Sequence, residues 1–303
     1  MTQPHVTGLR SIEYGMPDVK QAARFFEENW GLATVASAGG AVYLRATGPE
    51  HHIAVVRQSP KTRHVRVNLA APDKAAVDAL HARAKGLGIE LLGDPAIVNE
   101  PGGGYGFAFR DPDKHEYRIL ADVAQHADAR METDRPNKLS HVVLNSDRVE
   151  AETKWFCDSF GFKLSDRTAR MDFMRCSRDH HSLAFASFAG PSLNHVAYEV
   201  PNLDALMRGS ARMKKKGFKV EWGLGRHGPG NNIFTYFIEP NGLVCEYTTE
   251  VDQVDDSYKT GYPDDWKKRV QGPDRWGFSP PASERLHRAM SGVVEAYAVE
   301  AAA

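Results

Sequence analysis

Two segments decide the fold: GLRSIEYGMPDVKQAARFFEENWGL, residues 8–32, and KLSHVVLNSDRVEAETKWFCDSFGF, residues 138–162. They align without a gap at an offset of 130 residues, and the alignment places Gly31 on Gly161. Each segment begins with a strand-like run, continues as an amphipathic helix and ends at that glycine, a residue that commonly terminates helices. The same unit therefore occurs twice in the chain.

Three further pairs of segments repeat in the same order, at offsets close to 130: 49–56 with 178–185 (129), 63–73 with 194–204 (131) and 109–120 with 237–248 (128). A chance match would not preserve both order and spacing, so we interpret the two halves as a duplication. Each half also contains two units of a strand, a helix and further strand-like runs. The second helix is expected over Lys74–Leu87 in one half and Leu203–Lys216 in the other.

This organisation predicts an α+β fold of two tandem domains, each a pair of βαβββ modules that form a curved mixed sheet around a pocket. We expect an N-terminal domain over residues 1–130, a C-terminal domain over 131–250 and an extension over 251–303. The extension is rich in Asp, Pro, Gly and Trp, which indicates an ordered loop, and a terminal helix is expected over about Ala282–Val299.

The composition narrows the functional classes. The 303 residues include 38 Lys and Arg and 39 Asp and Glu, so the formal net charge of −1 argues against a nucleic-acid-binding surface. No apolar run approaches the roughly 20 residues that span a bilayer, and the first residues lack the pattern of a secretory signal. Three widely spaced cysteines are typical of reduced thiols. We therefore expect a cytoplasmic protein that binds neither nucleic acid nor a membrane.

Three residues of metal-ligand type lie inside strand-like runs: His141 in KLSHVVLNS, His195 in LNHVAYEV and Glu246 in GLVCEYTTE. A carboxylate among apolar neighbours is costly to bury unpaired, and a divalent cation removes that cost. Two imidazoles and a carboxylate are the ligand set of non-haem Fe(II) oxygenases, which leaves three coordination positions open for a vicinal diol and O₂. The pattern predicts one metal ion bound by these three side chains.

The duplication offers an internal comparison for this prediction. The sequence alignment places the three positions on Ser11, His64 and Arg118 of the first half, so only one is a ligand type and the arginine would repel a cation. A lone strand histidine more often belongs to a hydrogen-bonded core, but packing alone would not explain the difference between the halves. We expect the first half to be scaffold and the second to hold the metal. The pair His180-His181 adds little, because His51-His52 matches it.

The C-terminal half resembles the type I extradiol ring-cleavage dioxygenases, the catechol-cleaving branch of the vicinal-oxygen-chelate superfamily. The segments LSHVVLNS, CSRDHHSLAFASF, LNHVAYEV and LGRHGPGNNIFTYFIEPNGLVCEYTTE carry the resemblance, which extends over roughly residues 8–250. The last segment is the most specific, because His227, Tyr236 and Glu246 reproduce the spacing of the family.

The resemblance implies that the three ligands named above bind Fe(II), which Mn(II) could replace. It implies that His181 is the acid–base histidine of the active site and that His227 hydrogen-bonds near the substrate. It also implies that Tyr236 lies beside a metal-bound catechol oxygen. Phe185, Phe188, Ile233 and Phe234 are candidates for the pocket wall, although core packing is as good an interpretation of each.

The implied reaction inserts both atoms of O₂ into a substituted catechol-type diol and gives a ring-opened product like hydroxymuconic semialdehyde. The family also implies a homo-oligomer. The resemblance does not decide the substrate, which can be a monocyclic, a bicyclic or a trihydroxylated aromatic diol. Two alternatives remain: a glyoxalase-type metal isomerase, whose ligands usually come from both modules, and a non-catalytic aromatic-binding protein of the same fold.

Overall fold

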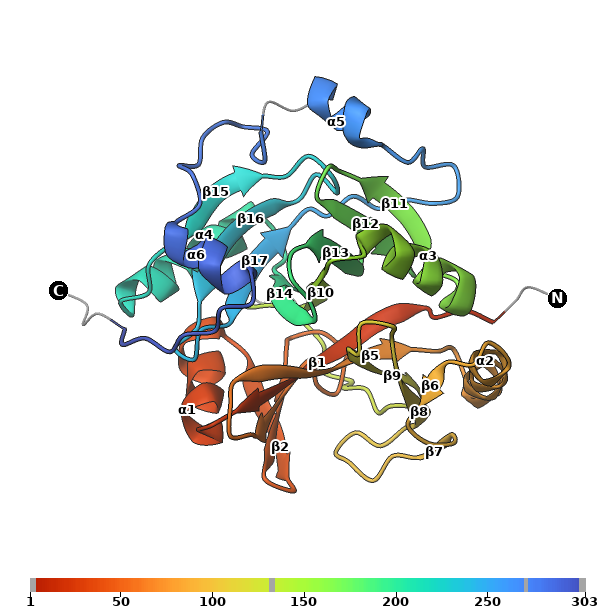
Figure 1. Ribbon diagram of the computed structural model, residues 1–303. Coiled ribbons are helices and arrows are strands. Elements are labelled where there is room, and N and C mark those ends of the chain that lie inside the picture. Colours follow the sequence, from red (N-terminus) through yellow and green to blue (C-terminus); the bar gives the residue numbers. More distant parts are fainter. Residues whose placement is uncertain (1–3, 131–133, 270–271, 300–303) are drawn as a thin grey trace.

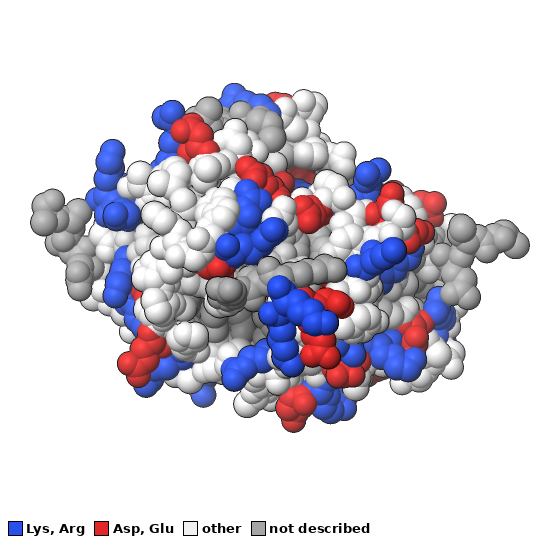
Figure 2. Space-filling view, turned by 90° about the horizontal axis from the view of Figure 1, so that it is seen from above, with Lys and Arg blue, Asp and Glu red and all other residues white. Residues whose placement is uncertain are grey.

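The computed structural model describes residues 4–130, 134–269 and 272–299. The chain forms two β-sheets with helices packed against them, and the N-terminal half, in red to yellow, lies beneath the C-terminal half, in green to blue (Figure 1). Within the described ranges, none of the helices combines the length and apolar character that crossing a membrane requires. On the face shown in Figure 2, Lys and Arg lie among Asp and Glu, in keeping with the net charge of −1.

The N-terminal half contains, in order, β1 (Gly8–Met16), α1 (Val19–Arg24), the π-helical segment η1 (Phe25–Trp30), β2 (Ala33–Ala38), β3 (Ala41–Arg45), β4 (Ala54–Gln58), β5 (Arg63–Ala70), α2 (Lys74–Gly86), β6 (Glu90–Leu91), β7 (Ala96–Ile97), β8 (Tyr105–Arg110) and β9 (Glu116–Ala121). The remainder contains β10 (Lys138–Ser146), α3 (Val149–Phe160), β11 (Lys163–Arg167), β12 (Met171–Arg175), β13 (Leu183–Ser187), β14 (Ser192–Glu199), α4 (Leu203–Lys215), β15 (Trp222–Arg226), β16 (Ile233–Ile238), β17 (Val244–Thr249), α5 (Pro263–Arg269) and α6 (Glu284–Met290).

The two sheets have the same strand order. The first runs β2-β3-β4-β1-β5-β9-β8-β6, with β7 also paired to β8, and the second runs β11-β12-β13-β10-β14-β17-β16-β15. In each sheet the two modules meet at an antiparallel pair, β1 with β5 and β10 with β14, and parallel pairs flank it. The predicted α+β architecture of paired βαβββ modules is confirmed, whereas the domain boundaries stay a prediction.

Glycine residues in the left-handed conformation lie at the ends of three helices. Gly31 and Gly161 follow their helices in the left-handed conformation, with φ of 93° and 76°, as the repeat predicted. The terminal helix is much shorter than the predicted Ala282–Val299, because α6 ends at Met290 and Gly292 takes a φ of 88° just beyond it. The extension follows the two edge strands of the second sheet, bridging β11 at Gly261 and β15 at Asp274 (Figure 1).

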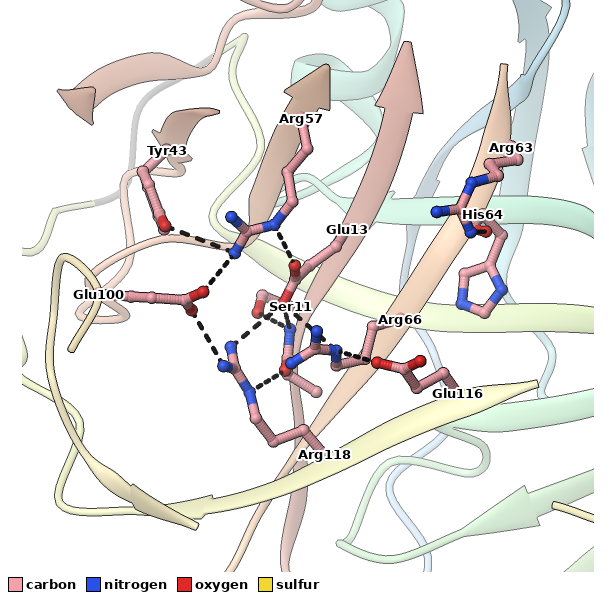
Figure 3. A network of polar contacts seen from close by, with 11 residues as sticks. Ser11, Glu13, Tyr43, Arg57, Arg63, His64, Arg66, Glu100, Glu116 and Arg118 are labelled. Carbon is pink, nitrogen blue, oxygen red and sulfur yellow. Dashed lines mark hydrogen bonds and ion pairs between the residues drawn. The ribbon is translucent and has the colours of Figure 1, made fainter. Parts of the chain in front are cut away.

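The strand pairing corrects the alignment of the two halves at one point. On β14, His195 pairs with Val143, and the matching pair on β5 and β1 is Arg66 with Glu13. The counterpart of His195 is therefore Arg66, and the alignment to His64 is wrong by two residues. A two-residue shift preserves the alternation of a strand, so the apolar pattern alone could not identify the register. Figure 3 shows His64 away from the side chains that surround Glu13.

None of the three N-terminal counterparts, Ser11, Arg66 and Arg118, is therefore a ligand type. Instead, arginines surround the buried carboxylate of Glu13 (Figure 3). The Nε of Arg57 donates to Glu13 at 2.6 Å and the Nη2 of Arg118 at 3.1 Å. Burial raises the pKa of Glu13, but Arg66, Arg118 and Arg57 outweigh it and lower the pKa to about 2.

One continuous apolar core joins the two halves. Trp30 of the first half is fully buried and stacks on Tyr247 of the second, with ring centroids 3.8 Å apart and planes 6° from parallel. The hydroxyl of Tyr247 donates to the carbonyl of Trp30 at 2.6 Å, and the hydroxyls of Tyr14 and Tyr198 lie 2.7 Å apart. Because Tyr247 adjoins Glu246 on β17, the packing of the first half fixes the strand that carries the predicted carboxylate ligand.

We expect Trp30→Ala to lower the free energy of unfolding by about 3–5 kcal/mol, because it removes a buried indole and leaves a cavity between the halves. Urea denaturation followed by circular dichroism measures this loss. Trp276→Ala, at a side chain that is 44% exposed, is the control. Equal losses in the two variants would contradict the inferred role of Trp30.

The Glu13 network predicts a pH dependence of stability. A carboxylate whose pKa is about 2 when folded and near 4.5 otherwise contributes about 3 kcal/mol above pH 4.5, and that contribution is lost as the pH falls toward 2. Unfolding free energies of the wild type and of Glu13→Gln should therefore differ most above pH 5 and converge toward pH 2. A difference that stays constant over this range would rule out the contribution.

Candidate metal centre

The three predicted ligands meet in the middle of the second sheet. His141 on β10, His195 on β14 and Glu246 on β17 occupy neighbouring strands, and one ligand atom from each lies within 4.8 Å of the others. All three are buried, with exposed fractions of 2%, 5% and 0%. Among the described residues, this is the one group of three or more His, Cys, Asp or Glu side chains close enough to hold a metal ion. We call it the ligand cluster.

The distances within the ligand cluster fit a shared ion. The Nε2 of His141 lies 3.2 Å from Glu246 Oε2, and the Nε2 of His195 lies 3.3 Å from the same oxygen. Ligand atoms bound about 2.1 Å from one cation, at right angles to each other, lie about 3 Å apart. The donor set therefore fits a divalent cation such as Fe(II) or Mn(II).

The surroundings of His195 fix which of its nitrogens faces the cluster. Its Nδ1 donates to the side-chain oxygen of Asn194 at 2.7 Å, which leaves Nε2 with a lone pair directed at Glu246. Asn194 is itself held, because its amide donates to Asn145 Oδ1 at 2.9 Å and to the carbonyl of Met290 at 3.1 Å. Sequence reasoning missed Asn194, although its place directly before a strand histidine was a signal.

The electrostatics of the cluster favour an ionised carboxylate. Burial raises the pKa of Glu246, but the neighbouring His141 outweighs this effect and holds the pKa well below its usual value. The Nδ2 of Asn232 adds a weak hydrogen bond to Glu246 Oε1 at 3.3 Å. Burial lowers the pKa of His195, so its imidazole is uncharged at neutral pH, as metal ligation requires.

The predicted acid–base histidine lies against this cluster. His181 precedes β13, is 2% exposed, and its ring centroid lies 4.2 Å from that of His141. Burial, followed by the neighbouring His141, lowers the pKa of His181 well below its ordinary value. The side chain is therefore a neutral imidazole that can accept a proton.

His227 and Tyr236 also lie near the cluster, and a hydrogen bond joins them. The Nδ1 of His227 donates to the carbonyl of Pro273 at 3.3 Å, so its Nε2 accepts from the Tyr236 hydroxyl at 3.1 Å. The Tyr236 ring lies 5.2 Å from that of His195. Burial lowers the pKa of His227 to about 4 and raises that of Tyr236, so both side chains are neutral at pH 7. All six sequence-predicted site residues are thus brought together.

The apolar candidates divide between the two faces of the sheet. Phe234 lies on the face of the cluster, where its ring stacks on that of His227 at 3.9 Å. Phe185 and Ile233 point to the opposite face and belong to the main core. Phe173, which sequence reasoning missed, meets the ring of His181 edge-on at 5.2 Å. The alternation of β16 would have separated Phe234 and Tyr236 from Ile233.

Comparisons with known proteins agree with this arrangement. A family model described as the Glyoxalase/Bleomycin resistance protein/Dioxygenase superfamily matches residues 138–247. A solved structure titled Mn(II)-bound glyoxalase, from Novosphingobium aromaticivorans, is 38% identical, covers 93% of this chain and 94% of that one, and has a TM-score of 0.86.

Two curated relatives have names that state an activity. Metapyrocatechase 2 of Cupriavidus necator is 33% identical over 39% of this chain and 38% of its own length. An iron-dependent extradiol dioxygenase of Rhodococcus jostii is 32% identical over 39% of this chain and 45% of its own length. The match thus spans about two fifths of these relatives. Because the Novosphingobium protein is matched over almost its whole length, the chain belongs to the Glyoxalase/Bleomycin resistance protein/Dioxygenase superfamily, the vicinal-oxygen-chelate proteins.

Proposed function

We propose that this protein is a metal-dependent extradiol dioxygenase that inserts both atoms of O₂ into a substituted catechol-type diol, as part of aromatic compound degradation. The observation that carries the proposal is a buried His-His-carboxylate cluster with three further polar side chains around it, His181, His227 and Tyr236. The names of the curated relatives support the same reaction.

In this proposal His141, His195 and Glu246 hold Fe(II). A similar protein is named iron-dependent and another is titled Mn(II)-bound, and nitrogen and oxygen donors discriminate weakly between these ions, so Mn(II) is the alternative. When bound, the ion would act as a Lewis acid that lowers the pKa of a substrate hydroxyl. It would also offer open coordination positions to the diol and O₂.

The protein side chains then orient the diol and handle its protons. The Tyr236 hydroxyl donates a hydrogen bond to His227 Nε2, so its oxygen can accept a hydrogen bond from a substrate hydroxyl. His181, neutral and pressed against His141, takes a proton from the substrate and returns it to the product as the ring opens. Phe173 and Phe234 flank these polar groups and exclude water.

A second function has one specific observation in its favour. The solved structure from Novosphingobium aromaticivorans is titled a glyoxalase, which suggests a metal-dependent isomerase. An isomerase consumes no O₂. The ligand cluster comes wholly from the second half, and the matching positions of the first half carry Ser11, Arg66 and Arg118, which favours the dioxygenase.

Location and assembly are further parts of the proposal. We place the protein in the cytoplasm, where reducing conditions suit its three free cysteines. The family resemblance implies a homo-oligomer, which light scattering of the purified protein tests.

Glu246→Gln should weaken metal binding by at least about 100-fold, because the variant loses a ligand and the charge that balances the cation. Metal per chain after dialysis against Fe(II) under argon measures the effect. Glu250→Gln, a nearby exposed carboxylate, should keep the wild-type metal content. Wild-type metal affinity in Glu246→Gln would refute the assigned ligand set.

Oxygen uptake by the Fe(II)-loaded protein with a panel of catechols tests the reaction. We expect uptake of one O₂ per diol and a yellow ring-opened product. His181→Ala should lower kcat by about 10²–10⁴ while keeping its metal, because acid–base help is lost. His52→Ala, the N-terminal counterpart, should keep its activity. If the protein isomerises a hemithioacetal and takes up no O₂ with any of the catechols, the isomerase is favoured.

A further inference from the structure

A second histidine lies directly behind the acid–base histidine. The Nδ1 of His180 lies 3.1 Å from the Nδ1 of His181, and the Nε2 of His180 lies 2.7 Å from Asp166 Oδ2. Asp166 and His180 are both 0% exposed, and His181 is 2% exposed. The three side chains therefore form a continuous buried chain of hydrogen bonds that ends at the ligand cluster.

The partners of Asp166 determine where the protons of this chain sit. Its carboxylate accepts from the backbone N–H of Gly261 at 2.6 Å and from the hydroxyl of Tyr258 at 3.0 Å. A carboxylate only accepts, so the Nε2 of His180 carries a proton and donates it. The Nδ1 of a neutral His180 is then an acceptor, and the proton between the two rings belongs to Nδ1 of His181. The Nε2 of His181 is left with a lone pair.

The duplication supplies a comparison inside the same molecule. In the first half, His51 and His52 also place their Nδ1 atoms 3.0 Å apart, so the turn itself produces this contact. The carboxylate is what differs. Asp166 pairs with Phe173, and the matching pair of the first sheet is Ala36 with Tyr43. The half that lacks the ligand cluster thus keeps the histidine pair but has alanine in place of Asp166.

The C-terminal extension contacts the backbone beside Asp166 and at His180. The backbone N–H of His180 donates to the carbonyl of Asp252 at 2.8 Å, and that of Arg167 donates to the carbonyl of Gly261 at 2.9 Å. A Cβ on Gly261 would lie 2.8 Å from Asp166 Oδ1, so this contact requires glycine. The extension therefore supplies the N–H and the hydroxyl that orient Asp166.

We propose that Asp166 and His180 are positioning residues that hold His181 in the tautomer with its proton on Nδ1, so that an unprotonated Nε2 faces the substrate. This inference rests on the proposed function. When His181 takes a proton from a substrate hydroxyl, the bond to hydrogen forms at Nε2 and the substrate oxygen keeps the electron pair. The resulting imidazolium retains its Nδ1–H bond to His180, and Asp166 balances its charge through His180.

Asp166→Asn tests the proposal, because an amide can reverse every bond of the chain. The Asn Nδ2 would donate to His180 Nε2, which places the proton of His180 on Nδ1 and that of His181 on Nε2. We expect kcat to fall by about 100-fold or more with KM and metal content unchanged, as wrong tautomers do in Ser-His-Asp triads. His51→Gln, in the half without the carboxylate, is the matched control and should change neither kcat nor the tautomer of His181.

The NMR signals of the His181 ring nitrogens report its tautomer, which would not change if Asp166 and His180 had only a structural role. Nitrogen-15 NMR of the full chain loaded with diamagnetic Zn(II) should show His181 protonated at Nδ1 in the wild type and at Nε2 in Asp166→Asn. Wild-type His181 protonated at Nε2 would overturn the proposal even if the variant does not fold. So would a loss of kcat in Asp166→Asn with an unchanged tautomer. Absence of O₂ uptake by the wild type would refute the dioxygenase but leave the tautomer result standing.

Discussion

The candidate metal centre contains a close contact that is unfavourable without a cation. Glu246 Oε2 lies 3.2 and 3.3 Å from two imidazole nitrogens, and the hydrogen bond to Asn194 leaves the His195 nitrogen with a lone pair facing the carboxylate. Two acceptors at this distance repel unless a proton or a metal ion lies between them. Because all three side chains are buried, water cannot relieve the repulsion. The site is thus arranged for a cation before any cation binds.

The first half meets the same constraint with side-chain cations. Its sheet has the same strand order, and the positions of His195 and Glu246 carry Arg66 and Arg118. The buried carboxylate has moved to Glu13, and guanidinium groups balance it in place of a metal (Figure 3). A duplicated scaffold has therefore kept a charged interior in both halves, with coordination chemistry fitted to only one of them.

The sequence was informative where residue type alone carries the signal. Gly31 and Gly161 predicted the ends of the repeated helices, and the ligand types of His141, His195 and Glu246 predicted a cluster that the sheet does assemble. The sequence did not predict the pairing register of β5, because the alternation of this strand allows either His64 or Arg66 as the counterpart of His195.

Contacts across long stretches of chain were also hidden in the sequence. Asp166 and His180 are 14 residues apart, and only the pairing of β11, β12 and β13 brings them together. Gly261 reaches the same carboxylate from the extension, 95 residues further along the chain. No local pattern marks such contacts, because each residue type is ordinary in its own segment.

The stacking of Trp30 on Tyr247 has a consequence for how such a duplicated chain can evolve. The first half covers the ring of Tyr247 on β17, the strand that carries Glu246. Deleting that half would therefore expose apolar surface next to the ligand cluster. The first half is therefore needed for packing, although Ser11, Arg66 and Arg118 at its matching positions are not metal ligands. Because the two halves pack on each other in this way, substitutions at these matching positions of the first half can be tolerated, whereas deletion of the whole half cannot.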